Sequence, residues 1–167
     1  MAYNQDFRGG GGKQFEDKSY TPEPVLIKTY FKEDGKTVLP ELFDTTANKV
    51  AESFIGKNKG GKETGVTSTQ LRRIFDEVKR FEQILSTSPE QWNTQYPYIR
   101  MIKSKVAYQV ARAAKDKSDE AGIYKNLEKF ISSCIDLVHS RDDYSIFVAL
   151  FEATYGFYYE KAPKSAK

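Results

Sequence analysis

Lysine and arginine residues recur along one amphipathic segment with a spacing that could bind an anion. The segment begins at Thr67 and carries four bases: Arg72, Arg73, Lys79 and Arg80. Each of the two arginine–base pairs is seven residues apart, which is two helical turns or about 10 Å. Arg72 and Arg73 also stand near the helix N-terminus, whose partial positive charge repels cations and attracts anions. Cations beside free N–H groups are typical of phosphate binding.

Local ion pairs account equally well for the first two arginines. Asp76 follows Arg72 by four residues, and Glu77 follows Arg73 by four. Oppositely charged side chains at this spacing stabilise an exposed helix by roughly a few tenths of a kcal/mol. The pattern of this helix alone therefore leaves both interpretations open.

A second segment, residues 96–117, carries bases with almost no acids beside them. Lys105, Tyr108 and Arg112 fall on one helical face, and Lys103 lies near the boundary of the apolar face. A solvated basic face is the alternative to a binding surface here. A tyrosine between lysine and arginine suits a sugar–phosphate chain, because the ring can stack and the cations neutralise phosphates.

The residues that catalysis or metal binding would need are nearly absent from the sequence. The single histidine, His139, falls at a helix end, where a structural role is the more common one. The single cysteine, Cys134, lies on an apolar stripe, without the exposure and activating base that a nucleophile needs. Cysteine and histidine are too few for a zinc site, and the carboxylates lack calcium-loop spacing. We expect a protein that is not an enzyme and holds no metal or cofactor.

The composition is that of one globular domain. The chain has 167 residues, of which 39% are hydrophobic, and a net charge of +3. Residues 98–117 hold six bases and one acid, whereas residues 119–160 hold three bases and eight acids. Such a basic patch is a common footprint of nucleic-acid binding. No apolar run is long enough for a membrane span, and one cysteine suits a reducing compartment, so we expect a cytoplasmic protein without membrane contact.

Helical periodicity dominates the chain beyond residue 41 and predicts an all-α bundle of about five helices. The first helix is capped by Asp44 or Thr45 and stops at Gly56, and residues 56–65 form a loop. Thr67 caps the next helix in a capping box with Gln70. Two further helices cover residues 96–117 and 123–138. Asp142 or Asp143 caps the last helix, which is apolar almost all round and is expected at the centre of the bundle.

The N-terminal residues differ in character from the rest. Residues 1–24 are rich in glycine, charge and proline, and we expect a flexible tail with one Arg-Gly-Gly element at residues 8–10. Residues 25–40 flank Asp34 and Gly35 with β-branched and aromatic residues, which indicates an extended arm or a short hairpin. The predicted organisation is therefore tail 1–24, arm 25–40, helical domain 41–161 and C-terminal tail 162–167.

Three motifs in this order resemble the small subunit of type III-A CRISPR effector complexes, the Csm small-subunit family. The motifs are "TSTQLRRIFDEVKR", "MIKSKVAYQVAR" and "FVALFEATYGFYYEK", and the resemblance covers residues 67–161 with weaker agreement back to residue 44.

The resemblance implies a non-catalytic helical bundle that stacks in several copies. Such subunits line the channel that holds guide RNA and single-stranded target RNA, beside the other effector subunits. The expected RNA-binding residues in this chain are the bases and the tyrosine of the two segments described above: Arg72, Arg73, Lys79, Arg80, Lys103, Lys105, Tyr108 and Arg112. The composition also fits a rival class, a helical adaptor that binds an acidic protein partner without nucleic acid.

Overall fold

Five α-helices and one small sheet make up most of the computed structural model, which describes residues 16–167. The helices are α1 (Thr45–Ser53), α2 (Ser68–Thr87), α3 (Trp92–Asp116), α4 (Ala121–Asp136) and α5 (Arg141–Lys161). Strands β1 (Ile55–Lys57) and β2 (Glu63–Gly65) pair antiparallel between α1 and α2. Four short 3-10 turns occupy Pro40–Leu42, Pro89–Gln91, Ser118–Glu120 and Lys164–Ala166. The predicted all-α bundle is confirmed.

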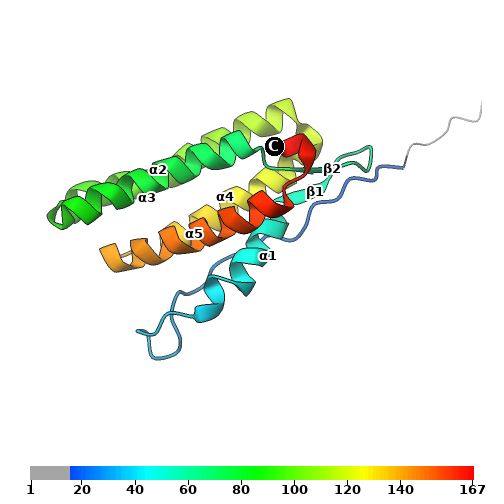
Figure 1. Cartoon of the computed structure of the whole chain (residues 1–167). Helices are drawn as coiled ribbons and strands as arrows, with labels where there is room; N and C mark the ends of the chain where they lie inside the picture. Colours follow the sequence, from blue (N-terminus) through cyan, green and yellow to red (C-terminus); the bar gives the residue numbers. More distant parts are fainter. Residues whose placement is uncertain (1–15) are drawn as a thin grey trace, which may run out of the picture.

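The long helices α2 and α3 form an antiparallel pair joined by the turn at Pro89–Gln91 (Figure 1). Helix α4 packs along α3, and α5 packs against α1 and α2. The apolar stripes predicted for α2 and α3 face this interior: Leu71, Ile74, Val78, Phe81 and Leu85 on α2, and Ile99, Ile102, Val106, Val110 and Ala113 on α3 are all buried. The opposite faces of α2 and α3 are thereby left to polar side chains.

Helix α3 begins at Trp92 and not at residue 96, and Pro97 lies inside it. A proline is tolerated best in the first turn of a helix, because it lacks the N–H that an interior position donates. At this position the missing bond falls in the second turn, and side-chain contacts hold that turn. Trp92 stacks on Tyr96 with ring centroids 4.9 Å apart. The Tyr96 hydroxyl donates a hydrogen bond of 2.8 Å to the Val138 carbonyl.

Helix α5 differs from its prediction in its cap and in its burial. Ser140 is the N-cap residue, and it forms a capping box with Asp143, which lies at the third helical position. The helix is not buried all round, because one stripe is exposed to solvent: Ser145, Ala149, Glu152, Gly156 and Tyr159. Alanine and glycine count as apolar when the sequence pattern is assigned, but they are small enough to be exposed to solvent at little cost. The all-round apolar pattern therefore overestimated the burial of this helix.

The glycine-rich segment predicted as a loop contains the sheet. Helix α1 is capped by Asp44 and ends at Ser53, so Gly56 does not stop it but lies in β1 opposite Thr64. A Cβ atom at Gly56 would clash with the Tyr20 carbonyl and lie 2.9 Å from the Ile123 side chain. The glycine permits close packing here. Spacing in the sequence does not distinguish this role from flexibility.

Residues 16–39 form an arm across α1 and α4, with little sheet structure. Tyr20 pairs with Lys57 of β1 through two backbone hydrogen bonds. The Tyr30 hydroxyl donates to the Cys134 carbonyl at 2.8 Å. The predicted Asp34–Gly35 turn is present, with Gly35 at a φ of 67°, but a single bridge between Phe31 and Val38 replaces the hairpin strands. Residues 8–10 of the predicted tail lie outside the described residues.

The two predicted tails also have described contacts. Residues 18–22 lie against β1 and α4, because the Asn126 side-chain amide donates to the Pro22 carbonyl at 2.9 Å. At the C-terminus Ala162 and Ala166 are buried. The Ser165 hydroxyl donates to the Glu63 carbonyl of β2 at 3.3 Å.

Candidate nucleic-acid interface

Side chains of α4 and α5 hold the N-terminus of α2 in place. The Thr67 hydroxyl accepts a hydrogen bond from the Gln70 backbone N–H at 3.4 Å, which confirms the predicted cap. The Tyr158 hydroxyl of α5 donates to the Val66 carbonyl, and the Tyr124 hydroxyl of α4 accepts from the Thr67 N–H at 3.3 Å. The first turn of α2 therefore has a defined position relative to α3.

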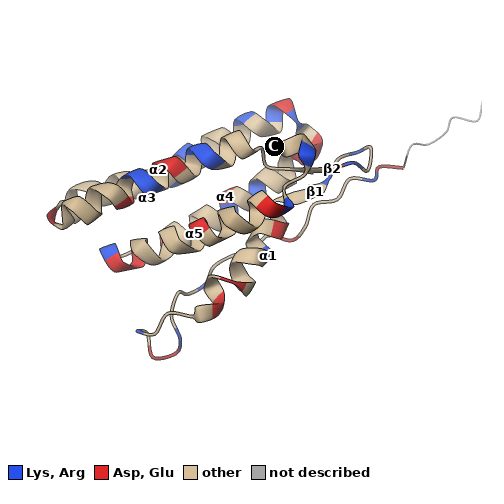
Figure 2. Cartoon of the chain, viewed as in Figure 1, with Lys and Arg blue, Asp and Glu red and all other residues tan. Residues whose placement is uncertain are grey.

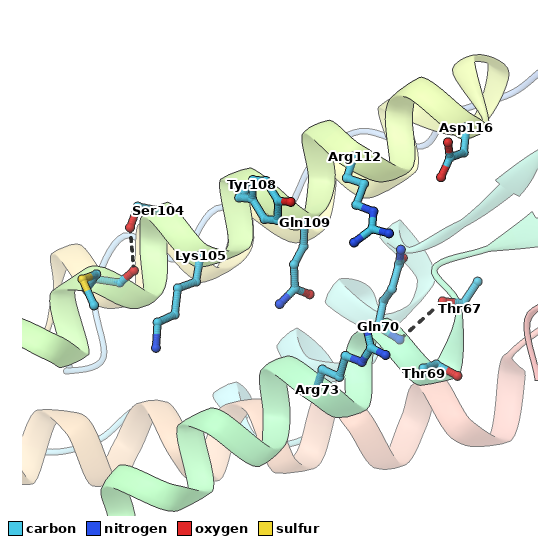
Figure 3. A pocket seen from close by; sticks show the side chains of 11 residues that line it. Thr67, Thr69, Gln70, Arg73, Ser104, Lys105, Tyr108, Gln109, Arg112 and Asp116 are labelled. Carbon is cyan, nitrogen blue, oxygen red and sulfur yellow. Dashed lines mark hydrogen bonds between the residues drawn. The ribbon is translucent and has the colours of Figure 1, made fainter.

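The second half of the predicted capping box is missing. The Gln70 side chain does not return to the Thr67 backbone but extends toward α3 (Figure 3), and its Oε1 atom is buried without a hydrogen-bond partner among the described residues. The capping box is incomplete because the Gln70 side chain packs toward the neighbouring helix α3 instead of the Thr67 backbone.

An open groove of about 720 Å³ runs between the first turns of α2 and the second half of α3. Among its lining residues, Thr69, Gln70 and Arg73 come from α2, and Lys105, Tyr108 and Arg112 come from α3. Figure 3 shows that Arg73 and Arg112 extend from their two helices toward the same end of the groove. Four of the eight predicted site residues are thus brought together: Arg73, Lys105, Tyr108 and Arg112.

Arg73 and Arg112 are the cations of this groove that have no carboxylate partner within the described chain. Both side chains are exposed. Tyr108 beside them is 68% exposed, so its ring is accessible from solvent. Asp116 is the single carboxylate among the groove's described lining residues. The groove therefore offers two unpaired guanidinium groups and an accessible aromatic ring.

Lys105 is paired across helices, although its own helix offers almost no acids. Its ammonium lies 2.5 Å from Glu77 Oε1, and the same carboxylate accepts from the Arg80 guanidinium at 3.1 Å. The hydrogen bonds from Arg80 and then from Lys105 hold the pKa of Glu77 below its usual range. The expected pair between Glu77 and Arg73 does not form. Glu77 of α2 pairs instead with Arg80 along the same helix and with Lys105 on the neighbouring helix.

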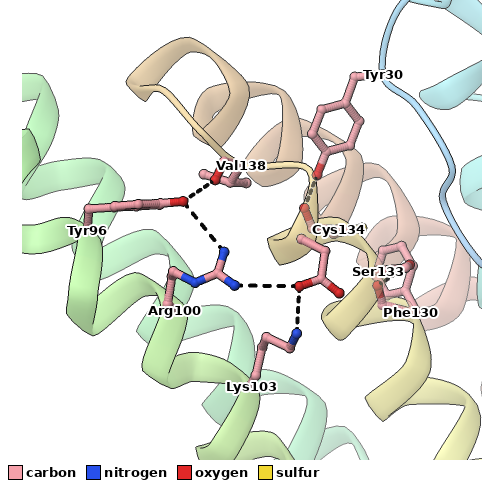
Figure 4. A network of polar contacts seen from close by, with 9 residues as sticks. Tyr30, Tyr96, Arg100, Lys103, Phe130, Ser133, Cys134 and Val138 are labelled. Carbon is pink, nitrogen blue, oxygen red and sulfur yellow. Dashed lines mark hydrogen bonds and ion pairs between the residues drawn. The ribbon is translucent and has the colours of Figure 1, made fainter.

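Lys103 faces α4 and not the groove. Its ammonium lies 2.6 Å from Asp136 Oδ1, and Arg100 approaches the same oxygen at 3.7 Å. Figure 4 shows both side chains reaching from α3 toward this end of α4.

Arg72 and Lys79 lie on the flank of α2 away from α3. Arg72 approaches Asp76 at 3.8 Å, which is the predicted local pair. Lys79 contacts Glu82 and lies 3.7 Å from Glu152 of α5, and its hydrogen bond to Glu82 raises its pKa. Of the seven predicted cations, Arg73, Lys105 and Arg112 line the groove, whereas Arg72, Lys79, Arg80 and Lys103 do not.

Among the groove residues that the sequence analysis missed are two glutamines. Gln70 was assigned only to a cap, and Gln109 was not considered at all. The signal for Gln109 was available, because it follows Lys105 by four residues and so lies on the same helical face. Neutral amides carry no charge pattern, which explains why they were overlooked.

Other candidate chemistry is weak in the described part of the chain. Cys134 is fully buried, and this burial raises the pKa of its thiol. Residues 16–167 contain no cluster of histidine, cysteine or carboxylate side chains that could hold a metal ion. Among these residues no helix is both long and apolar enough to cross a lipid bilayer.

Together, the bundle and the groove define an all-α protein with a cationic surface between two long helices (Figure 2). Residues 40–162 match the family Csm2 Type III-A, and the chain belongs to this family. The predicted family is confirmed, and the match spans all five helices and both strands. The chain is accordingly a subunit of a type III-A CRISPR complex, in which it assembles with other Csm subunits. No curated protein and no solved structure matches the chain.

Proposed function

We propose that the groove between α2 and α3 binds the sugar–phosphate backbone of RNA, without cleaving it. In the assembled complex, several stacked copies of this subunit line the channel for guide RNA and target RNA. This role suits a cytoplasmic complex whose catalytic steps belong to other subunits.

One observation carries the proposal: two unpaired arginines from different helices lie in one groove beside an exposed tyrosine. A protein gains little stability from leaving guanidinium groups unpaired next to a helix N-terminus, since the helix dipole disfavours cations there. A phosphate at this position would accept hydrogen bonds from both arginines. The Tyr108 ring is suited to stacking on a base, and stacking tolerates any sequence.

The proposal leaves different roles for the remaining predicted residues. Lys105 can contribute to RNA binding only in competition with Glu77, which already binds its ammonium. Lys79 and Lys103 have carboxylate partners on neighbouring helices, so we assign them to holding helices together. Arg72 approaches Asp76 within α2, so we assign it to stabilising that helix.

The test is a double variant, Arg73→Ala/Arg112→Ala, in the assembled complex. Loss of two phosphate contacts lowers the salt slope of RNA affinity by about 1.4 for each copy that contacts the RNA, because each contact to a single strand contributes about 0.7. The loss should be similar for unrelated RNA sequences, since backbone contacts carry no sequence information. The melting temperature should change little, because both side chains are exposed.

The matched control is Lys36→Ala/Lys129→Ala, which removes the same charge from exposed positions outside the groove. It should leave the salt slope unchanged if the groove is the binding site. If both double variants lower the salt slope equally, the effect comes from the net charge of the protein and not from contacts in the groove. An unchanged slope for the groove variant would favour the adaptor role, which predicts no competition by single-stranded RNA.

A further inference from the structure

Two neutral side chains in the groove have hydrogen-bonding capacity that nothing in residues 16–167 uses. Gln70 of α2 and Gln109 of α3 both line it, and in each the Oε1 atom is buried without a partner. One other side-chain atom in the described chain shares this state, Glu120 Oε2, and it has an ammonium group 3.5 Å away. The two amide acceptors that lack any donor therefore belong to the same groove.

A buried acceptor without a donor is costly, and an occupant of the groove can supply one once each terminal amide turns its enclosed oxygen toward the groove. The phosphates that Arg73 and Arg112 attract cannot do so, because ionised phosphate oxygens only accept hydrogen bonds. The ribose 2′-hydroxyl is the group of a nucleic-acid backbone that donates, and DNA lacks it. A strand with its phosphates on the two arginines would bring its sugars to this part of the groove.

We propose that Gln70 and Gln109 accept hydrogen bonds from ribose 2′-hydroxyl groups and make the groove selective for RNA over DNA. The inference rests on the proposed backbone binding and adds the residues that recognise the sugar. The arginines supply affinity for either nucleic acid, and the glutamines supply the discrimination. Water and the amino groups of the bases could also donate hydrogen bonds to these amides. The probes must therefore carry the same bases and differ only in the sugar.

The experiment compares oligouridylate with oligodeoxyuridylate on the full chain at low ionic strength. A third probe, 2′-fluoro oligouridylate, keeps an RNA-like sugar but cannot donate. The variants are Gln70→Leu and Gln109→Leu, which remove the acceptor at similar volume. The matched control is Gln83→Leu, an exposed position on α2 outside the groove. Melting temperatures accompany every affinity.

The wild-type chain should bind oligouridylate more tightly than either of the other two probes. Each groove variant should weaken oligouridylate binding about fivefold, the equivalent of one ordinary hydrogen bond. Binding of oligodeoxyuridylate should stay within about twofold, and the Gln83→Leu variant should behave as wild type on all probes.

Equal losses on the ribose and deoxyribose probes would overturn the inference, since the amides would then hold the groove's shape or a water molecule. Equal wild-type binding of all three probes would overturn it as well, and this comparison needs no variant to fold. Either result leaves backbone binding standing. Failure of the wild-type chain to bind any probe would instead contradict the proposed function.

Discussion

At the scale of single residues, Glu77 determines how many cations the groove can offer. Its carboxylate lies on the α3 side of α2, holds both Lys105 and Arg80, and is only 24% exposed. A carboxylate in this position occupies the donors that a phosphate would otherwise use. Arg73 and Arg112 escape this competition, and this difference is why we assign them the larger part in RNA binding.

A Glu77→Gln variant should be less stable at neutral pH, with a deficit that disappears in acid. The folded-state pKa of Glu77 is lowered by its partners, so its contribution to stability is complete above the unfolded value of about 4.3. That contribution is lost as the pH falls through the lower folded value. Thermal melts of both proteins from neutral to acidic pH measure the difference.

The control for this prediction is Asp76→Asn, at a 66% exposed position with one distant partner, Arg72. It should change the melting temperature little at any pH, because exposed pairs contribute little. A Glu77→Gln deficit that is constant with pH would show that packing, and not the charge, is what the substitution removes.

At the scale of elements, the groove depends on how the first turn of α2 is seated. Gly65 precedes that turn, and a Cβ atom there would lie 2.5 Å from the Tyr158 hydroxyl and 3.0 Å from the Phe54 carbonyl. Neither contact can relax easily. The Phe54 carbonyl belongs to the backbone, and the Tyr158 hydroxyl already donates a hydrogen bond to the Val66 carbonyl. The position is therefore closed to any side chain.

Gly65→Ala should destabilise the protein by about 1–3 kcal/mol, the usual cost of overpacking. Gly156→Ala is the opposite case, because nothing lies within 4 Å of the added atom and the residue is inside α5. It should stabilise the protein by roughly 0.5–1 kcal/mol through helix propensity. Denaturant unfolding of both variants measures the contrast. Equal stabilities would mean that the turn before α2 yields easily and does not seat the helix.

The elements were largely predictable from the sequence, whereas the pairing of charges was not. Apolar residues at helical spacing, such as Leu71, Ile74 and Val78, predicted the faces of α2 correctly because burial follows periodicity. Periodicity carries no information on which side chains meet across two helices. The bases Lys103 and Lys105 appeared unpaired for this reason, although Asp136 and Glu77 stand opposite them.

The same limit applies to the sheet and to the groove. Residue 56 must be glycine because a side chain there would clash with the carbonyl of Tyr20, which is distant in sequence. No local sequence pattern indicates this contact. Thr67 as the cap of α2 was predictable, since the capping motif is local. The route of the Gln70 side chain into the groove was not, because it depends on the position of α3.

At the scale of the whole molecule, charge is distributed unevenly along the chain. Residues 98–117 are strongly basic, and residues 119–160 carry an excess of acids. Figure 2 shows lysine and arginine gathered along α2 and α3. A subunit with such a division can present one surface to RNA while other surfaces contact protein neighbours, and we propose this arrangement within the type III-A complex.

The most direct test of RNA binding in this groove is photo-crosslinking in the assembled complex. RNA that carries 4-thiouridine is bound and irradiated, and the crosslinked peptides are identified by mass spectrometry. We predict crosslinks within residues 101–112 of α3, centred on Tyr108, and within residues 69–73 of α2. The Arg73→Ala/Arg112→Ala variant should lose most of this signal. Crosslinks confined to α4 and α5, with none on α2 or α3, would contradict the proposal that RNA lies in this groove.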